Sequence, residues 1–362
     1  MQSVSSLLSE SWFTLSREDQ SEALEVAAAS TGRPPHLLEK DTWVVWTLSA
    51  IYESALAKKL TFKGGTSLSK AYKIIDRFSE DVDLTYDIRE LVPDLLRDGN
   101  PIPTSNSQAK KITDAVRDRL PNWIKNTVQP ILESAMQREG VKATLSIVGK
   151  ENEKLILNYT PIKLGTGYAA STIQLEFDGR ATGEPHQHQM VACDMAPAIE
   201  EISFPTAQPL VMRAERTFWE KATAAHVYSL QGRLRGERYS RHWYDLAAMA
   251  KSGHAYTAIT DRQLAQNVAE HKSMFFAEKD ADKVWINYAT AVSGGIKLVP
   301  EGDDLQALKL DYAAMLEDGL LPSNQPSFVE IIDICTELQK KINFHGKRFL
   351  INPSAVAELN QL

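Results

Sequence analysis

The segment from Phe62 to Tyr86, FKGGTSLSKAYKIIDRFSEDVDLTY, most constrains what this chain can fold into. It begins with two adjacent glycines and ends with two aspartates, Asp81 and Asp83, on either side of Val82. Successive side chains of a β-strand point to opposite faces, so both carboxylates would share one face while Val82 enters a core. Adjacent carboxylates repel each other, and the pattern therefore predicts a strand whose polar face holds a divalent cation.

Two glycines, Gly64 and Gly65, precede this strand and predict a sharp turn at which the backbone approaches a ligand closely. Thr66 and Ser67 follow and open a short helix, and helix N-termini bind phosphate through free N–H groups. Each of the two features also has a simpler interpretation: the glycines could form a plain β-turn, and the aspartates could lie at an exposed strand end. Together they predict a site for a metal-bound nucleoside triphosphate. A P-loop fits poorly, because no Gly-Lys-Ser/Thr follows the turn.

Three blocks of this sequence resemble one known family. KGGTSLSKAY and RFSEDVDL, within residues 63–84, resemble the signature of the nucleotidyltransferase superfamily with the DNA polymerase β type of fold. More narrowly, they resemble the AbiEii-type nucleotidyltransferase toxins of abortive-infection, type IV toxin–antitoxin systems. The blocks RAERTFWEKATAAH at 213–226 and RHWYDLAAM at 241–249 extend this similarity.

The resemblance implies an enzyme that moves a nucleoside monophosphate from an NTP to an acceptor hydroxyl and releases pyrophosphate. It implies Mg²⁺ as the cofactor in a two-metal site, with Mn²⁺ as the alternative ion, and tRNA or another RNA as the acceptor. The expected protein partner is a cognate antitoxin or its transcriptional repressor. Two alternatives stay open: a protein or small-molecule hydroxyl as acceptor, and a non-catalytic nucleotide-binding protein.

The two later blocks supply further candidate residues through the same resemblance. Lys221 matches a lysine that contacts the triphosphate, with an ordinary helix-surface ion pair as the simpler interpretation. Asp245 matches a required aspartate, which would orient Lys221 or an arginine such as Arg241. The simpler interpretation of Asp245 is a carboxylate that interacts with a helix dipole.

The superfamily also has a third carboxylate on a neighbouring strand, and the run at 172–178 offers Glu176 and Asp178. Glu176 would complete the metal site or act as a base for the incoming hydroxyl, but both acids share one face and Asp178 stays an alternative. Arg77 and Ser79, just before the aspartate strand, are candidate nucleotide-binding residues. A turn hydroxyl is the simpler interpretation of Ser79.

The composition limits the classes of protein and of partner. The 362 residues carry a net charge of -7, so any RNA must bind through a local basic surface. Candidate cations form two groups, and a solvated face is the alternative for each: Lys58, Lys59, Lys63, Lys70, Lys73 and Arg77, and then Arg233, Arg235, Arg238 and Arg241. The sequence has two cysteines and no apolar run of membrane-spanning length, which predicts a cytoplasmic protein that does not enter a membrane.

The pattern of the chain predicts an α+β fold, with a nucleotidyltransferase-type mixed sheet, flanking helices and a helical C-terminal region. We expect N-terminal helices in residues 1–58, the catalytic core in 59–205, and a helical domain that completes the site in 206–362. The HQH run at 186–188 is expected in a surface loop. The predicted elements are helices at 16–30, 41–56, 66–75 and 109–139, strands at 60–62, 81–86, 143–148, 155–159 and 172–177, and mainly helices from 213 onward.

Overall fold

The computed structural model describes residues 10–165, 170–232, 234, 238–317, 319–322 and 324–351. The strands of this part are β1 Glu10–Ser11, β2 Leu60–Lys63, β3 Val82–Tyr86, β4 Ala143–Val148, β5 Lys154–Tyr159, β6 Thr172–Asp178, β7 His186–His188, β8 Val191–Ala192, β9 Ile202–Ser203, β10 Thr206–Ala207 and β11 Leu210–Met212. The helices are α1 Arg17–Thr31, α2 Pro35–Tyr52, α3 Gly64–Lys70, α4 Ile88–Leu91, α5 Asn106–Trp123, α6 Gln129–Glu139, α7 Ala214–Gln231, α8 Ser240–Lys251, α9 His254–Thr260, α10 Arg262–Phe275, α11 Tyr288–Thr290, α12 Gly302–Glu317 and α13 Phe328–Ile351.

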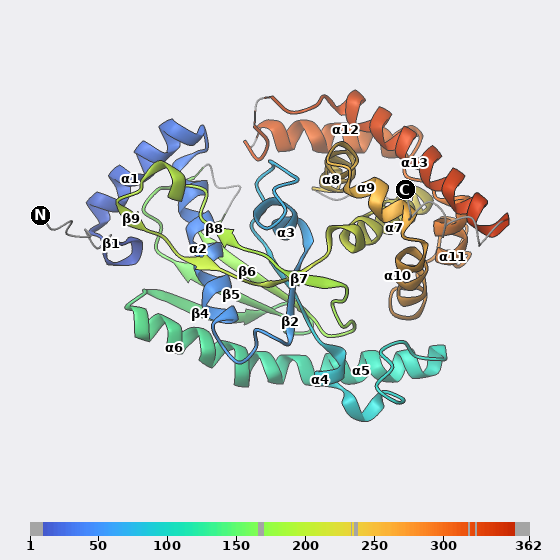
Figure 1. Ribbon diagram of the computed structural model, residues 1–362, viewed down its shortest axis with the longest axis horizontal. Coiled ribbons are helices and arrows are strands. Elements are labelled where there is room, and N and C mark those ends of the chain that lie inside the picture. Colours follow the sequence, from blue (N-terminus) through green and yellow to red (C-terminus); the bar gives the residue numbers. More distant parts are fainter. Residues whose placement is uncertain are drawn as a thin grey trace, which may run out of the picture.

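A mixed seven-stranded sheet in the order β4-β5-β6-β3-β2-β11-β7 forms the centre of the molecule (Figure 1). Strand β3 lies between its antiparallel neighbour β2 and its parallel neighbour β6. Along β6, Ile173, Leu175 and Phe177 are buried, whereas the residues between them are half-buried. One face of the central strands is therefore apolar and the other is polar, as the alternation predicts.

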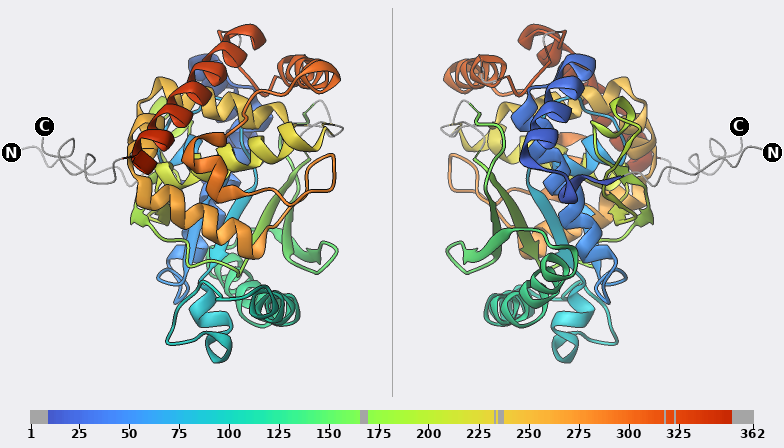
Figure 2. Two further views of the ribbon diagram at one scale, coloured as in Figure 1. Left: turned by 90° about the vertical axis from the view of Figure 1, so that its right-hand side faces the viewer. Right: turned by 90° about the vertical axis from the view of Figure 1, so that its left-hand side faces the viewer.

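The helices form two groups with separate apolar cores. Helices α1, α2, α5 and α6 share a core with the apolar face of the sheet, and both views in Figure 2 show α5 and α6 along its lower side. Helices α7 to α13 form the second core and gather at the other end of the molecule from α1 and α2 (Figure 1). Leu68 of α3 and the nearby Ile75 belong to the second core, so α3 connects the two groups. The predicted α+β fold with a mixed sheet and a helical C-terminal region is confirmed.

Local signals predicted some boundaries and missed others. The helix predicted at 16–30 is α1, where Ser16 accepts a hydrogen bond from the N–H of Asp19 and Gly32 ends the helix in the left-handed region. Helix α2 begins six residues before the predicted Asp41, because proline fits the first turn of a helix, and it already ends at Tyr52. The predicted end at 56 is therefore wrong.

Two further expectations are corrected. The helix predicted at 66–75 is α3, which stops at Lys70, and Lys73 has a left-handed φ of 53° that a continuous helix does not allow. The HQH run expected in a loop forms the edge strand β7, because its backbone pairs antiparallel with β11. The helix predicted at 109–139 forms as α5 and α6, with a π-helical turn at Ile124–Val128 between them.

The strand β11 follows the predicted boundary near residue 205 and pairs with β2 inside the sheet. The N-terminal helices share the core of the sheet, as described above. The division into 1–58, 59–205 and 206–362 stays a prediction, and its first nine and last eleven residues lie outside the described part of the chain. Among the helices that the structure describes, none is long and apolar enough to cross a membrane.

His226 of α7 connects this helix to the segment that precedes α12. Its side chain is buried, and its Nδ1 accepts a hydrogen bond of 2.9 Å from the backbone N–H of Lys297. Burial lowers the pKa of His226 to about 4, because the charged imidazolium loses its solvation. The folded protein therefore keeps His226 neutral at pH values where an unfolded chain would protonate it.

This linkage predicts that the free energy of unfolding falls as the pH drops from 6.5 towards 4, because the unfolded state binds the proton first. The contribution of His226 is at most about 3 kcal/mol. In the variant His226→Asn, the amide oxygen can still accept the hydrogen bond from Lys297, but the site no longer titrates. Urea unfolding at pH 7, 5.5 and 4.5 should show a shallower pH dependence in this variant. An identical dependence in both proteins would contradict the assignment.

Candidate active site

Three neighbouring strands place charged side chains in one row on the polar face of the sheet. Lys63 at the end of β2 and Glu176 of β6 both lie in register with Asp83 of β3. Asp81 precedes β3 by one residue and therefore shares the face of Asp83. Both aspartates are half-buried. The predicted pair of carboxylates on one face is thus present, and a cation from β2 lies beside it.

The turn between β2 and α3 needs glycine for two physical reasons. Gly64 has a φ of 79°, in the left-handed region that other residues avoid. A Cβ atom at Gly64 would also overlap Oδ2 of Asp83. A Cβ atom at Gly65 would overlap the guanidinium of Arg77 and lie 2.8 Å from Oγ of Ser79. The backbone of this turn therefore lies directly against the residues that the sequence predicted as its functional neighbours.

The hydroxyl groups that follow the glycines hold this turn in place. Oγ1 of Thr66 donates a hydrogen bond of 2.6 Å to the carbonyl oxygen of Asp81 and lies 3.0 Å from Oγ of Ser79. Oγ of Ser67 donates a hydrogen bond of 2.9 Å to the carbonyl oxygen of Gly64. Because both hydroxyls are used internally, backbone N–H groups are the donors that the first turn of α3 offers to a ligand.

Asp245 forms the most buried charge cluster of the site. Its side chain is fully buried in the second turn of α8, and its carboxylate oxygens accept hydrogen bonds of 2.6 and 2.7 Å from Nε and Nη2 of Arg77. Nζ of Lys221 lies 2.8 Å from Oδ2 of the same carboxylate. The sequence predicted the contact with Lys221, but the arginine is Arg77 and not Arg241. With both oxygens in ion pairs, Asp245 does not serve as a simple dipole partner.

The pKa values follow from this arrangement. Burial would raise the pKa of Asp245, but the charges and hydrogen bonds of Arg77 and Lys221 hold it well below its usual range. By contrast, burial raises the pKa of Asp83 to about 6, and the charges of Asp81 and Glu176 act in the same direction. Burial and the charge of Glu80 likewise raise the pKa of Asp81. The two aspartates thus lack full compensation by cations.

The two candidates for the third carboxylate differ in their surroundings. Glu176 lies in the row of Asp83, and its Oε2 is 3.1 Å from Nζ of Lys154. Asp178 lies one pleat further along β6 and accepts hydrogen bonds from Nε and the backbone N–H of Arg180, at 3.0 and 3.1 Å. Burial raises the pKa of Asp178, but Arg180 and Lys63 lower it well below its usual range. This placement favours Glu176 over Asp178 as the third carboxylate.

The donor set fits a hard divalent cation. Within the described residues, no three His, Cys, Asp or Glu side chains lie close enough together to form a complete metal site. Asp81 and Asp83 nevertheless offer carboxylate oxygens on one face. Burial, and then the charges of Asp81 and Glu176, raise the pKa of Asp83, and a bound cation would offset both effects. Gln174 Nε2 lies 3.5 Å from both Asp81 Oδ1 and Glu176 Oε2, which places Glu176 near the pair.

Sequence reasoning missed the role of Lys63. Burial would lower the pKa of Lys63, but the charges of Glu220, Asp178 and Asp83 raise it above its usual value. Lys63 appeared in the sequence only as a member of a basic group, although its position next to Gly64 places it beside the turn. Its pairing with Asp83 depends on strand register, which the sequence does not contain.

The two predicted basic surfaces differ from expectation. In the first group, Lys70 is buried between Asp41 and Asp194, at 2.5 and 2.6 Å, and Arg77 is buried against Asp245. These cations stabilise the interior and do not form a surface patch. In the second group, Arg238 and Arg241 line a small hollow beside Ser79 and Asp81. Arg233 and Arg235 lie outside the described residues.

Comparison with known proteins identifies the family. The sequence profile of the AbiEii family, described as nucleotidyl transferase AbiEii toxin of type IV toxin–antitoxin systems, matches residues 46–334. The chain belongs to the AbiEii family of nucleotidyltransferase toxins. The family resemblance of the three sequence blocks is thereby confirmed, and all three lie within the matched region.

Among solved structures, one match to this chain is MenT4, a nucleotidyltransferase toxin from Mycobacterium tuberculosis H37Rv. The TM-score is 0.40 and the sequence identity 13%, over 91% of this chain and 99% of MenT4. The comparison with curated protein sequences gives no match. Membership of the AbiEii family implies an NTP substrate and an antitoxin partner.

The close approach at the glycine turn predicts that Gly64→Ala lowers nucleotidyl transfer by about 100-fold, because the new methyl group displaces the Asp83 carboxylate by about 1 Å or more. Gly99→Ala is the matched control, since Gly99 has a φ of 73° and no atom within 4 Å of an added Cβ. Transfer rates of both variants would be measured beside their circular dichroism. Equal losses of activity would show that backbone strain alone is responsible.

The Asp245 cluster predicts a large effect on stability. Asp245→Asn keeps the shape of the side chain but leaves Arg77 and Lys221 buried without their counter-charge. We expect the free energy of unfolding to fall by about 3–5 kcal/mol in urea titrations. Asp94→Asn is the control, because Asp94 forms an exposed pair with Arg119 at 2.5 Å, and such pairs contribute little. A comparable loss in both variants would contradict the role of burial.

Proposed function

We propose that this AbiEii protein transfers a nucleoside monophosphate from an NTP to a hydroxyl group of RNA, with tRNA as the preferred acceptor class, in a Mg²⁺-dependent reaction. The observation that carries this proposal is the direct contact between the Gly64 backbone and the Asp83 side chain. It places the open N–H groups of a helix start beside a pair of carboxylates. A triphosphate and its cation need these two features within a few ångströms of each other.

The first turn of α3 holds the phosphates in this proposal. The backbone N–H groups of Gly64, Gly65 and Thr66 lack partners within the helix, as in the first turn of any helix, and supply the donors. Arg77 donates hydrogen bonds to the carboxylate of Asp245 and to the carbonyl oxygen of Phe78. It therefore supports the turn and is not a phosphate ligand in this proposal. Ser79 closes the other side of the turn through its contact with Thr66.

Lys221 is the cation that faces the leaving group. One side of its ammonium is held by Asp245, and its charge acts on Asp83 by lowering the pKa of that carboxyl. An ammonium held between these acids can compensate the negative charge that develops as pyrophosphate departs. Asp245 keeps this ammonium in place and does not touch the substrate.

Asp81, Asp83 and Glu176 would hold the cation. When bound, Mg²⁺, or Mn²⁺ in its place, compensates phosphate charge and favours the deprotonated hydroxyl. The acceptor oxygen forms a new bond to the α-phosphorus, and the bond between that phosphorus and the oxygen bridging to the β-phosphate breaks. Pyrophosphate leaves with that oxygen, and a carboxylate of the site, with Glu176 as the candidate, accepts the hydroxyl proton.

An RNA acceptor is supported by cations around the carboxylates. Lys154 pairs with Glu176 at one side, and Arg238 and Arg241 line the hollow beside Asp81. These side chains provide the local positive charge that an acidic chain needs for binding a phosphate backbone. Both cysteines are buried and unpaired, which fits the reducing cytoplasm. A protein or small-molecule acceptor, or nucleotide binding without transfer, stays as an alternative outcome.

The test is transfer of α-³²P-labelled NTPs, one at a time, onto total RNA with Mg²⁺. We expect label on a tRNA-sized band, and loss of at least about 1,000-fold in Asp83→Asn, because electrostatic groups at a phosphoryl centre have effects of this size. Glu176→Gln should also be strongly impaired, whereas Asp178→Asn should keep most activity, because Asp178 is bound to Arg180. Label on protein alone, or no metal-dependent label on any acceptor, would contradict the RNA proposal.

A further inference from the structure

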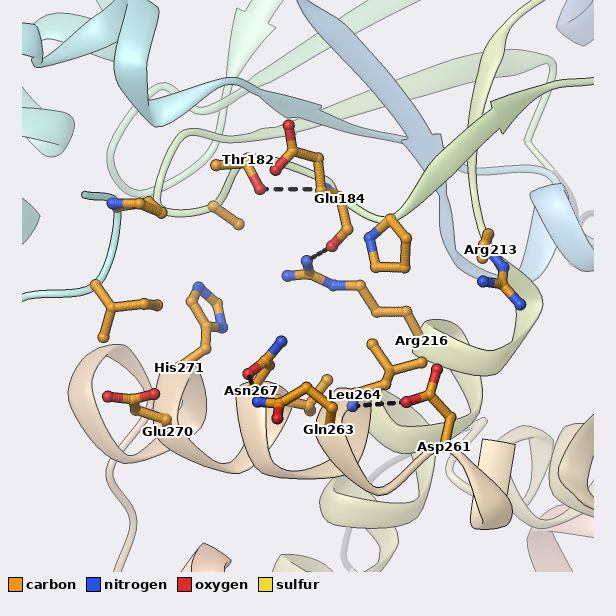
Figure 3. A pocket seen from close by; sticks show the side chains of 15 residues that line it. Thr182, Glu184, Arg213, Arg216, Asp261, Gln263, Leu264, Asn267, Glu270 and His271 are labelled. Atoms are coloured by element: carbon orange, nitrogen blue, oxygen red, sulfur yellow. Dashed lines mark hydrogen bonds between the residues drawn. The ribbon is translucent and has the colours of Figure 1, made fainter. Parts of the chain in front are cut away.

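A cavity of about 500 Å³ lies outside the predicted active-site residues. It is lined by residues of α10, the start of α7, the segment at 181–185 and the loop at 101–102, as Figure 3 shows from close by. Its volume lies in the range of pockets that bind small organic molecules. None of the metal-binding or nucleotide-binding residues named in the preceding subsections lines it.

Three polar side chains of this cavity have hydrogen-bonding capacity left for a ligand. Arg216 is nine-tenths buried and its guanidinium points into the cavity (Figure 3). Its Nη1 donates to the carbonyl oxygen of Glu184 and its Nε lies 3.3 Å from Glu220. Within the described part of the chain, its Nη2 makes no hydrogen bond. A buried guanidinium with a free edge is suited to an anionic oxygen ligand.

Asn267 and His271 of α10 complete this polar side. Oδ1 of Asn267 accepts a hydrogen bond of 2.9 Å from Gln263, so the protons of Nδ2 stay available (Figure 3). Nε2 of His271 lies 2.9 Å from the carbonyl oxygen of Arg180 and must therefore carry the proton. Nδ1 of His271 is then an acceptor. The cavity thus offers two groups of donors and one acceptor.

The acidic residues of the lining do not cancel this preference. Glu184 is bound to Arg89 at 2.7 Å, and Asp261 accepts a hydrogen bond of 3.0 Å from the N–H of Leu264 as the cap of α10. The carboxylate of Glu270 points away from the centre of the cavity (Figure 3). The apolar part of the lining consists mainly of Pro101, Ile102, Ala181, Leu264 and Val268. An anionic group and a flat apolar group would therefore both find partners.

The cavity is connected to the catalytic row through charged residues. Glu220 interacts with Arg216 of the cavity on one side and with Lys63 beside Asp83 on the other. Lys272 adds a cation along this strip, because its charge interacts with those of Glu220 and Lys63. Arg180 lies beside Lys272, over the same ring of Phe276. Ala181 of the lining follows Glu176 by five positions, which is at most about 18 Å of extended chain.

We propose that this cavity binds one nucleotide unit, with its phosphate on Arg216 and Asn267 and its base against Ile102, Leu264 and Val268. This nucleotide is either part of the acceptor strand, upstream of the reacting hydroxyl, or a free nucleotide. Both sources present the same phosphate and base to the cavity. The assignment to an acceptor strand rests on the proposed function. The strip of cations between the cavity and Asp83 favours this source, because a continuous backbone would follow it.

The test uses the full chain with Asp83→Asn, which prevents turnover. Fluorescein-labelled single-stranded RNA octamers and free AMP are titrated separately, with Asn267→Asp as the variant. A carboxylate at this exposed position repels the phosphate, and we expect about tenfold weaker binding. The control is Gln266→Glu, which makes the same change from amide to acid at the preceding residue, and Gln266 does not line the cavity. We expect less than a twofold effect there.

The outcomes separate the two sources. Weaker binding of RNA in Asn267→Asp alone, with a raised KM for RNA and an unchanged KM for NTP in the active protein, supports an acceptor nucleotide. Weaker binding of AMP with unchanged RNA binding supports a free nucleotide. Equal affinities of Asn267→Asp and Gln266→Glu for both probes would overturn the inference while the proposed function stands. If the wild-type protein transfers no label to RNA, the proposed function is overturned instead, and the AMP titration still tests the cavity.

Discussion

The buried carboxylate of Asp245 is the interaction on which the rest of the site depends. It joins Arg77, which precedes the aspartate strand, to Lys221 of α7, and so connects the sheet to the helical C-terminal region. A fully buried carboxylate is strongly unfavourable unless cations surround it, and this one has two. Neither cation could stay buried without it. The same cluster therefore stabilises the packing of two regions and fixes the ammonium group of Lys221, whose charge acts on Asp83.

A second constraint is the absence of a side chain at Gly64. The turn can approach Asp83 only because no Cβ lies between them. Thr66 then binds the carbonyl oxygen of Asp81, so the start of the helix and the start of β3 are held to each other. On the opposite side, Lys63 and Glu176 complete the row across three strands. The region between these elements combines open N–H groups, carboxylates and an ammonium, which is the set that nucleotidyl transfer requires.

Much of this arrangement could be predicted from local patterns. Alternation of apolar and polar residues predicted β6, a capping serine predicted the start of α1 at Ser16, and three sequence blocks indicated the AbiEii family. Other predictions failed where distant contacts compete with local preference. The strand at His186–His188 exists because β11 offers it a partner, and its sequence alone suggests a loop. The basic group at 58–77 suggested a surface, but two of its members, Lys70 and Arg77, find buried acids on other elements.

The sequence by itself determined how the turn and the aspartate strand present Gly64, Gly65, Asp81 and Asp83, because these residues lie within one short segment and their geometry follows from strand and turn rules. Only the tertiary structure decided their partners. Arg77 and Asp245 are separated by 168 residues, and Lys63 meets Asp83 and Glu176 through the register of the sheet. The cavity beside Arg216 likewise forms only when α7, α10 and two loops come together. Contacts of this kind depend on how the elements pack, and no local pattern records that.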